Sequence, residues 1–512
     1  MYGHDLGSTR FSPLKQINAQ NVSNLSKAWS YDMRPGGNGP ASAAYAEVTP
    51  IVVNGVMYLP AGNKVVALDG DSGKEIWRFE LKTGLASARG VAYWPGTRHH
   101  AARIFFTSGH KIMALDATTG KPAAGFGPDG SITLKVPFAE VPTIYKNIII
   151  IGANVYGPGE TNLHPQDEVG KGVPGDSRAF SAITGKKLWD FHTVPHPGEV
   201  GNNTWGDDSW KDRGGANVWS ITMSVDAKRG ILYMPVGGPA ANYYGGDRPG
   251  DNLFSNTLVA VNANTGKLKW YFQFSPHNLY DYDAVQTPVL VNASFKGRPR
   301  KLIVTANRNG FLYILDRTNG HFLFAKQFAQ QLNWATGIDE NGRPISAGLI
   351  PDEKGVKVCP ANGGATNWYS PSYNPATRMF YFRSYDDCAV FRARPTAFEP
   401  GAGFYATGAR LSNEPGKGYI NAFDLEKLDF AWRDKQIGSY KGWGGVMSTA
   451  SGLVAYGDDA QNFVVLNGRT GRPLWHFHVG QLIHASPMSY AVRGKQYFAV
   501  AAGSDVFAFA LP

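Results

Sequence analysis

One short phrase recurs along the chain, and this repetition constrains the fold more than any other feature. Each copy combines an apolar strand, a turn centred on glycine and an aromatic residue four positions after that glycine. The clearest copies are VVALDGDSGKEIW (65–77), RAFSAITGKKLW (178–189), VAVNANTGKLKW (259–270) and VVLNGRTGRPLW (464–475), with weaker ones at 112–123, 312–324 and 420–432. Because glycine readily adopts the positive φ of tight turns, each copy predicts a hairpin whose second strand carries the aromatic residue.

A single hairpin cannot bury its own tryptophan, so neighbouring copies must cover it, as in solenoids and propellers. The irregular spacing favours four-stranded propeller blades with loops of different lengths. The last segment, 486–512, supplies three strands, and 27–31 with Trp29 can add the fourth. We therefore expect an all-β, eight-bladed propeller with Trp-containing docking repeats. It would form one domain over 1–512, its ring closed by the N- and C-terminal strands. Two packed sandwich domains are the alternative, which leaves the shared phrase unexplained.

Composition and charge narrow the location and the partners. No apolar run is long enough to span a membrane. The chain opens without an apolar leader, so we expect either a cytosolic protein or a secreted one that has been processed. Its net charge is +10, but Lys and Arg are scattered and no nucleic-acid-binding motif occurs. We expect no nucleic-acid partner. A basic surface suits an acidic protein partner, and a surface that is merely solvated is the alternative.

The two cysteines, Cys359 and Cys388, favour the secreted alternative. They are far apart in sequence and form no metal-binding spacing with each other or with histidine. A disulfide between them would stabilise the fold by roughly 3–4 kcal/mol through loop closure. Two buried free thiols are the other interpretation.

Asp281-Tyr282-Asp283 stands out in the polar region between two repeats. If 280–284 is extended, residues two apart face the same side, and both carboxylates enter one space. Close carboxylates repel unless one is protonated or a hard cation such as Ca²⁺ lies between them. One carboxylate could then bind metal while the other acts as a general base. A solvated aspartate pair in a turn is the alternative for this motif taken alone.

Longer segments around these motifs resemble the pyrroloquinoline quinone (PQQ) dependent dehydrogenases, which include methanol, ethanol and glucose dehydrogenases. The resemblance covers nearly the whole chain. It rests on GHDLGSTRFSPLKQINAQNVSNLSKAWSY near the start, RGVAYWPG, RPGDNLFSNTLVAVNANTGKLKW, PHNLYDYDAVQTPVL, GATNWYSPSYNPAT and ASPMSYAVRGKQYFAV near the end.

The resemblance implies a cofactor site, because PQQ is a flat ortho-quinone with three carboxylates and needs aromatic faces and cations. Trp219 matches the indole that stacks under PQQ, and Arg89 matches the arginine that pairs with its carboxylates. Arg308 matches the cation beside the quinone oxygens, where it would stabilise negative charge. Trp443 resembles a further ring contact. A core tryptophan or an ordinary ion pair is the alternative at each position.

The resemblance also implies the catalytic and metal-binding residues. Asp281 falls on the family's catalytic base, which takes the hydroxyl proton while hydride passes to the quinone beside a bound metal. Asp283 resembles the extra carboxylate of members that use lanthanides, so Ca²⁺ and a lanthanide both remain open, with Asp281 and Asp283 as ligands.

Several family features are replaced in this chain. Gly238 stands where a metal-binding asparagine is common, and Glu160 and Glu168 are mere candidates for the metal-binding glutamate. The adjacent cysteines of the alcohol dehydrogenases are missing from 83–87, which favours an alcohol larger than methanol.

We therefore expect a periplasmic PQQ-dependent dehydrogenase that oxidises an alcohol or sugar hydroxyl. Its electrons would pass to a separate cytochrome c or similar acceptor, because the chain has no Cys-x-x-Cys-His haem motif. The alternative is a non-catalytic propeller scaffold of the outer-membrane assembly type, which would need neither the two aspartates nor Trp219 and Arg308.

Overall fold

The computed structural model describes residues 2–34, 47–134, 140–153, 175–211, 213–396, 407–412, 416–438 and 442–512. These residues form β-strands and a few short 3-10 turns: η1 (Val22–Asn24), η3 (Asn202–Thr204), η4 (Gly206–Asp208) and η5 (Ser220–Thr222). No helix in the described part of the chain is long and apolar enough to cross a bilayer. The all-β prediction is confirmed.

Four antiparallel sheets come first along the chain, each with its strands in sequence order. They are β3 (Ile51–Val53), β4 (Val56–Ala61), β5 (Lys64–Asp69) and β6 (Glu75–Glu80); β7 (Ala92–Trp94), β8 (Arg103–Ser108), β9 (Lys111–Asp116) and β10 (Ser131–Thr133); β11 (Thr143–Tyr145), β12 (Ile148–Gly152), β13 (Ser177–Ser181) and β14 (Lys187–Phe191); and β15 (Ser224–Asp226), β16 (Ile231–Pro235), β17 (Thr257–Asn262) and β18 (Leu268–Gln273).

Four more sheets follow, the last of which takes its outer strand from the start of the chain. They are β19 (Val289–Phe295), β20 (Arg298–Ala306), β21 (Phe311–Asp316) and β22 (Phe322–Gln327); β26 (Ser372–Asn374), β27 (Met379–Asp386), β30 (Lys417–Asp424) and β31 (Asp429–Lys435); β32 (Val446–Thr449), β33 (Leu453–Gly457), β34 (Asn462–Asn467) and β35 (Pro473–His478), with β1 (Phe11–Ser12) added to β32; and β36 (Met488–Val492), β37 (Lys495–Ala502), β38 (Asp505–Ala510) and β2 (Ser26–Asp32).

Two smaller sheets are inserted after β22. One pairs β23 (Ala335–Ile338) with β24 (Pro344–Ser346), and the other joins β25 (Val356–Val358), β28 (Ala389–Ala393) and β29 (Thr407–Leu411). A disulfide links Cys359, just after β25, to Cys388, just before β28. The predicted bridge is therefore confirmed, and the free-thiol alternative is wrong.

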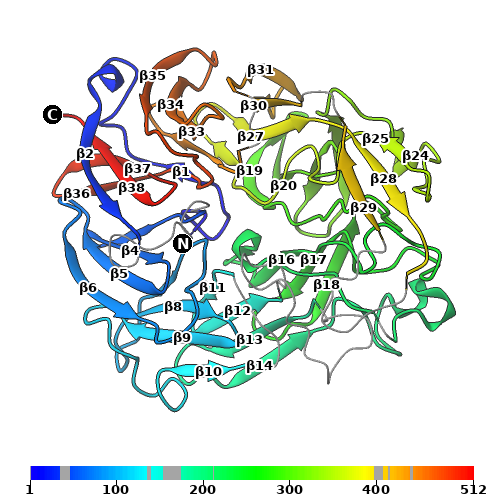
Figure 1. The fold of residues 1–512 in the computed structure, drawn as a ribbon, viewed down its shortest axis with the longest axis horizontal. Coiled ribbons are helices and arrows are strands. Elements are labelled where there is room, and N and C mark those ends of the chain that lie inside the picture. The colour runs from blue at the N-terminus through cyan, green and yellow to red at the C-terminus, as the bar shows by residue number, and fades with distance from the viewer. Residues whose placement is uncertain are drawn as a thin grey trace.

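The two ends of the chain meet in one sheet. Strand β2 runs antiparallel to β38, with Trp29 opposite Ala508, and Figure 1 shows the blue N-terminal strand beside the red C-terminal ones. In the same view the sheets follow one another around a common centre. The predicted pairing of 27–31 with the C-terminal segment is confirmed.

The repeated phrase forms the third and fourth strands of its sheet. Six copies make the pairs β5–β6, β13–β14, β17–β18, β21–β22, β30–β31 and β34–β35, and each pair has a register shift one or two residues before its turn. The copy at 112–123 differs, because β9 pairs with β10 at the more distant residues 131–133.

Turn glycines of the phrase pack against tryptophans of other sheets. A Cβ atom added to Gly73 would lie 2.6 Å from Cε3 of Trp29, and one added to Gly320 would lie 2.5 Å from Cε3 of Trp270. Gly120, Gly266 and Gly471 contact Trp77, Trp189 and Trp432 in the same way. The glycines thus leave room for an indole as well as permitting positive φ.

The N-terminal segment ties several sheets together. The carbonyls of Leu6, Gly7 and Thr9 accept hydrogen bonds from the backbone N–H groups of Val225 (2.7 Å), Leu290 (2.9 Å) and Tyr373 (2.9 Å). These partners lie on β15, β19 and β26, and β1 then pairs with β32. Seven residues of chain therefore hold the first strands of four sheets.

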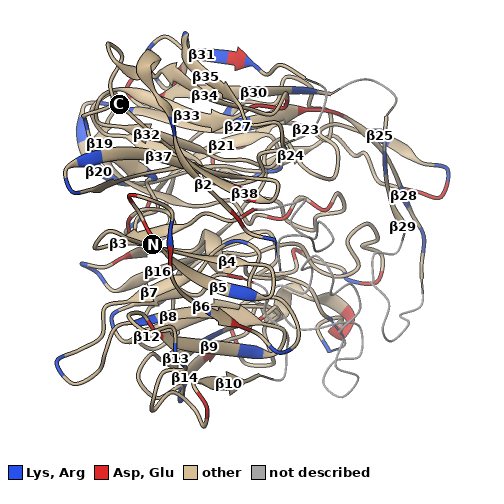
Figure 2. Cartoon of the chain, turned by 60° about the vertical axis from the view of Figure 1, so that its left-hand side comes forward, with Lys and Arg blue, Asp and Glu red and all other residues tan. Residues whose placement is uncertain are grey.

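Charged residues are distributed over many elements. In Figure 2 basic and acidic residues are scattered over strands and loops throughout the view. The net charge of +10 is therefore spread over the surface in this view, as the scattered Lys and Arg in the sequence predicted.

The packing of glycine on tryptophan can be tested within one sheet. Gly320 and Gly297 both have positive φ (77° and 76°), but a Cβ added to Gly297 meets nothing within 4 Å. We expect Gly297→Ala to destabilise the fold by about 1–2 kcal/mol through backbone strain. Gly320→Ala should cost about 1–3 kcal/mol more, because the methyl group overlaps Trp270. Thermal unfolding midpoints measure the difference, and equal shifts in the two variants would refute the contact.

Candidate active site

Asp281 and Asp283 lie on the loop between β18 and β19. Tyr282 anchors this loop, since its hydroxyl donates to the Pro360 carbonyl (2.5 Å) and its N–H donates to Asn278 Oδ1 (3.0 Å). Asp281 has φ of 58°, so the extended conformation expected for 280–284 is wrong. The Asn278 side chain also accepts from the N–H of Tyr280 (3.1 Å), which bends the backbone here.

Arg308 connects the loop to the rest of the site. Its Nη1 lies 3.1 Å from Asp283 Oδ2 and donates to the Asp281 carbonyl oxygen at 2.9 Å. Its Nη2 donates to Asn367 Oδ1 at 3.1 Å. A Cβ added to Gly364 would lie 2.5 Å from the Cβ of Arg308, so only a glycine leaves space for the arginine here. One guanidinium therefore binds both predicted aspartates.

Trp219 lies against two arginines. The Arg89 Cζ is 4.8 Å from the centroid of Trp219 and 3.9 Å from that of Trp368, and the Arg308 Cζ is 5.9 Å from Trp219. Arg89 also donates to Glu47 Oε2 at 2.7 Å and to Glu140. Two cations thus converge on one indole, within range of cation–π attraction.

Trp443 belongs to the same region. It packs against the buried hydrophobic cluster that includes Trp219 and Trp368, and its ring lies edge-on to Tyr369 at 6.3 Å. The structure therefore brings together all the predicted site residues: Arg89, Trp219, Asp281, Asp283, Arg308 and Trp443. Their individual roles stay predictions.

Three polar side chains at this site were not predicted. Asn242 Nδ2 donates to Asp281 Oδ1 at 2.5 Å, and the Tyr243 hydroxyl lies 3.4 Å from Asp281 Oδ2. Asn367 holds Arg308, as described above. Asn242 and Tyr243 stand in a polar stretch between repeats, but nothing in their spacing distinguishes them from ordinary loop residues.

The surroundings of Asp281 change its acidity. Burial raises the pKa of the Asp281 carboxyl group, the nearby Asp283 carboxylate raises it further, and Arg308, Asn242 and Tyr243 lower it, for a result of about 7. Asp281 is therefore poised to exchange a proton near neutral pH.

The donor set fits a hard cation and a flat anionic ring. Two carboxylates and neighbouring amide oxygens are ligands that Ca²⁺ or a lanthanide prefers, and an indole flanked by arginines suits PQQ. Three buried polar atoms of this region find no hydrogen-bond partner among the described residues: Asn217 Oδ1, Asn256 Oδ1 and Arg308 Nε. The predicted glutamate candidates, Glu160 and Glu168, lie outside the described residues.

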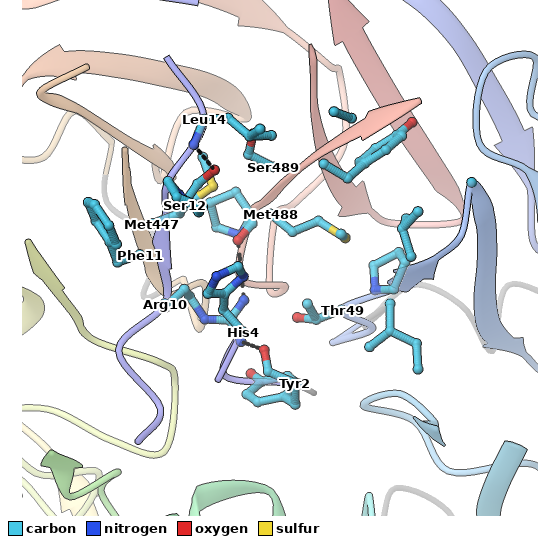
Figure 3. Close-up of a pocket in the computed structure, with 18 of the residues that line it drawn as sticks. Tyr2, His4, Arg10, Phe11, Ser12, Leu14, Thr49, Met447, Met488 and Ser489 are labelled. Atoms are coloured by element: carbon cyan, nitrogen blue, oxygen red, sulfur yellow. Dashed lines mark hydrogen bonds between the residues drawn. The ribbon is translucent and has the colours of Figure 1, made fainter. Parts of the chain in front are cut away.

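A separate pocket of about 410 Å³ lies beside the N-terminal segment, and its lining contains none of the predicted site residues. In Figure 3 Arg10 extends past His4 and is hydrogen-bonded to Tyr2. Arg10 Nη2 donates to the Tyr2 carbonyl at 2.6 Å, and its Cζ lies 4.4 Å from the Tyr2 ring. Arg10 Nη1 also donates to the Pro487 carbonyl at 3.2 Å, so this arginine links the N-terminal segment to the segment before β36.

Comparisons with known proteins agree with this geometry. The model of the glucose/ethanol/alcohol dehydrogenase β-propeller domain, a PQQ family, matches residues 1–329 and 413–498. A quinohemoprotein alcohol dehydrogenase of Pseudomonas putida, ADH IIB, is 32% identical over 98% of this chain and 73% of its own length. The 1-butanol dehydrogenase (cytochrome c) of Thauera butanivorans is 30% identical over 98% of this chain and 74% of its own.

A solved structure extends the match to three dimensions. The crystal structure of the quinohemoprotein alcohol dehydrogenase from Comamonas testosteroni superposes with a TM-score of 0.85 at 29% identity, covering 100% of this chain and 80% of that one. The propeller fold excludes the sandwich alternative, and the dehydrogenase relatives do not support the scaffold alternative. The chain therefore belongs to the PQQ-dependent alcohol dehydrogenases, a family of enzymes that oxidise alcohols.

Proposed function

We propose that the protein oxidises an alcohol or sugar hydroxyl at this cluster, with Asp281 as the general base. The observation that carries the proposal is the position of the Asp281 carboxyl group, which is buried beside Asp283 and contacted by Asn242 and Tyr243, so that its pKa rises to about 7. In the metal-free protein, a carboxylate with a raised pKa accepts a proton more readily than an exposed aspartate does. Asn242 and Tyr243 hold its two oxygens in place.

We propose that Trp219, Arg89, Arg308 and Trp443 form the PQQ site. When bound, PQQ accepts two electrons from the alcohol carbon as a hydride. Trp219 offers the stacking face, and Arg89 is held over it by Glu47 and Glu140. Arg308 contributes a fixed positive charge beside Asp281, and it would stabilise negative charge that develops on the quinone oxygens.

We further propose that Asp281 and Asp283 bind a metal ion, either Ca²⁺ or a lanthanide. Two carboxylates separated by one residue supply anionic oxygens to a hard cation. Arg308 Nη1 holds Asp283 Oδ2 at 3.1 Å while Gly238 N–H donates to Asp283 Oδ1 at 2.5 Å. Both carboxylate oxygens of Asp283 are therefore held in place by protein groups without a bound metal.

The architecture supports a finer proposal about the fold. We propose that residues 1–512 form one domain in which the eight four-stranded units are blades of a closed propeller. The tryptophans would dock each blade onto the next. The contacts of Gly73 with Trp29 and of Gly320 with Trp270 support this, as does the Trp475 indole N–H, which donates to the Leu25 carbonyl at 3.2 Å across the closure.

We propose a periplasmic location and a separate cytochrome c or similar electron acceptor. The disulfide suits an oxidising compartment, and one relative carries cytochrome c in its name. The net charge of +10 favours encounter with an acidic acceptor. The proposed substrate is a small-molecule alcohol or sugar that is larger than methanol.

Replacing Asp281 by asparagine tests the base. The variant keeps the shape of the side chain and tolerates the positive φ. With PQQ and Ca²⁺ or a light lanthanide added, we expect turnover to fall roughly 10²–10⁴-fold, the usual contribution of a general base. Dye reduction with primary, secondary and sugar alcohols measures turnover, and tryptophan fluorescence quenching measures PQQ binding.

The matched control is Asp251→Asn, which removes an exposed carboxylate paired with Arg343. It should leave both turnover and PQQ binding near wild type. Retention of turnover by Asp281→Asn within threefold of wild type would remove its assigned role, whereas loss of PQQ binding would mean that Asp281 supports the cofactor site instead.

Asp281 also predicts how the stability of the metal-free protein depends on pH. Its folded pKa of about 7 lies above the ordinary value of 3.8, so the folded state binds a proton that the unfolded state releases. This stabilisation is complete below about pH 4 and is lost as the pH rises to about 7. Between these pH values the free energy of unfolding of wild type should fall, relative to that of Asp281→Asn, by at most about 1.4 kcal/mol per pH unit. Denaturant unfolding from pH 4 to 8 measures it, and parallel curves would contradict the shift.

A further inference from the structure

Gly238 and Asn256 lie side by side just beyond the paired strands β16 and β17. The N–H of Val236 donates to the Thr257 carbonyl and the N–H of Asn256 donates to the Gly237 carbonyl, both at 2.8 Å. The ladder between the two strands thus continues past their ends. A side chain on one segment can therefore occupy space that a side chain on the other would use.

The space above Gly238 is bordered by oxygen atoms. A Cβ added to Gly238 would lie 3.3 Å from Asp283 Oδ1 and 3.8 Å from Asn256 Oδ1. The third nearest atom to this added Cβ is the Asn256 amide nitrogen, at 3.9 Å. The carboxylate of Asp283 and the amide of Asn256 therefore face the place where a residue at 238 would project.

Only one of the two polar atoms of the Asn256 side chain has a hydrogen-bond partner among the described residues. Its Nδ2 donates to the Tyr282 carbonyl at 2.8 Å, which lies between the two aspartates. Its Oδ1 is buried and has no partner among the described residues. A buried amide oxygen without a partner costs about 1–3 kcal/mol, so a compensating partner is expected.

The backbone does not account for this residue. Asn256 has φ of 51°, a conformation that glycine adopts at lower cost than asparagine. A glycine would also avoid the unpaired oxygen. The asparagine is therefore better explained by something that binds Oδ1, and amide oxygens are preferred ligands of hard cations.

We propose that Asn256 Oδ1 is a ligand of the cation bound by Asp281 and Asp283, replacing the side chain that position 238 lacks. This inference rests on the proposed metal site. The amide ligand would then come from Asn256, just before β17, and not from position 238, which follows β16. The chemical class of the ligand is a hard, oxygen-seeking cation such as Ca²⁺ or a trivalent lanthanide.

The test exchanges the two residues. Asn256→Gly removes the oxygen and keeps the backbone conformation, and Gly238→Asn places an amide on the opposite segment, where a Cβ has no contact closer than 3.3 Å. Calorimetric titration of the metal-free protein with Ca²⁺ and with La³⁺ gives the affinity. We expect Asn256→Gly to weaken binding at least tenfold, and the double variant Gly238→Asn/Asn256→Gly to recover to within about threefold of wild type.

The matched control is Asn252→Gly. Asn252 is also fully buried with positive φ, but its Oδ1 already accepts from Arg248 Nη1 at 2.8 Å. This variant should lose stability and keep the metal affinity of wild type. Equal affinities for wild type and Asn256→Gly, or equal losses in Asn256→Gly and Asn252→Gly, would overturn the assignment.

Asn256→Asp provides a second variant if Asn256→Gly does not fold. It keeps an oxygen and adds negative charge, so metal should raise its unfolding temperature more than that of wild type, and La³⁺ more than Ca²⁺. An equal rise would overturn the proposal. If wild type binds PQQ and oxidises alcohol, but Asn256→Gly binds the metal as tightly as wild type does, only this inference is refuted. If wild type neither binds metal nor oxidises alcohol, the proposed function is refuted as well.

Discussion

The site depends on one guanidinium. Arg308 reaches the Asp281 carbonyl, the Asp283 carboxylate and the Asn367 amide, and lies near the face of Trp219. These partners come from three separate segments of the chain, so the arginine fixes their relative positions. A buried guanidinium with several acceptors resists displacement, because every lost bond would leave a buried charge less well satisfied. Arg308 therefore fixes the backbone at the predicted base, whose carboxylate oxygens are held by Asn242 and Tyr243.

The sheets supply rigid positions for these segments. Asp281 follows β18, Arg308 follows β20, and Asn367 precedes β26. The strands are held by hairpins whose turns pack glycine against tryptophan, and the first strands of four sheets are tied by the N-terminal segment. Functional residues on short connections between such strands keep their places although the connections themselves have no regular structure.

The repeated hairpins and the closing strand at 27–31 could be predicted from the sequence, whereas individual side-chain contacts could not. The repeated phrase predicted the hairpins because glycine, turn and tryptophan are close in sequence. The site residues were predicted from a family resemblance carried by segments such as PHNLYDYDAVQTPVL. The bend at Asp281 was missed, since it comes from hydrogen bonds to Asn278. Asn242, Asn256 and Asn367 were missed because each acts through contacts far along the chain.

The electrostatics of the site also explain why a base and a metal belong together here. Asp281 and Asp283 share a single cation, Arg308, and burial favours the neutral form, so the pKa of Asp281 rises to about 7. A base must be ionised to accept a proton. When Asp281 and Asp283 are both ionised, however, Arg308 balances only one of their two negative charges. A divalent or trivalent ion would supply it and would lower the pKa of Asp281. Proton acceptance and metal binding at these two aspartates are therefore coupled: a tightly bound metal increases the ionised fraction of the base while weakening its attraction for a proton.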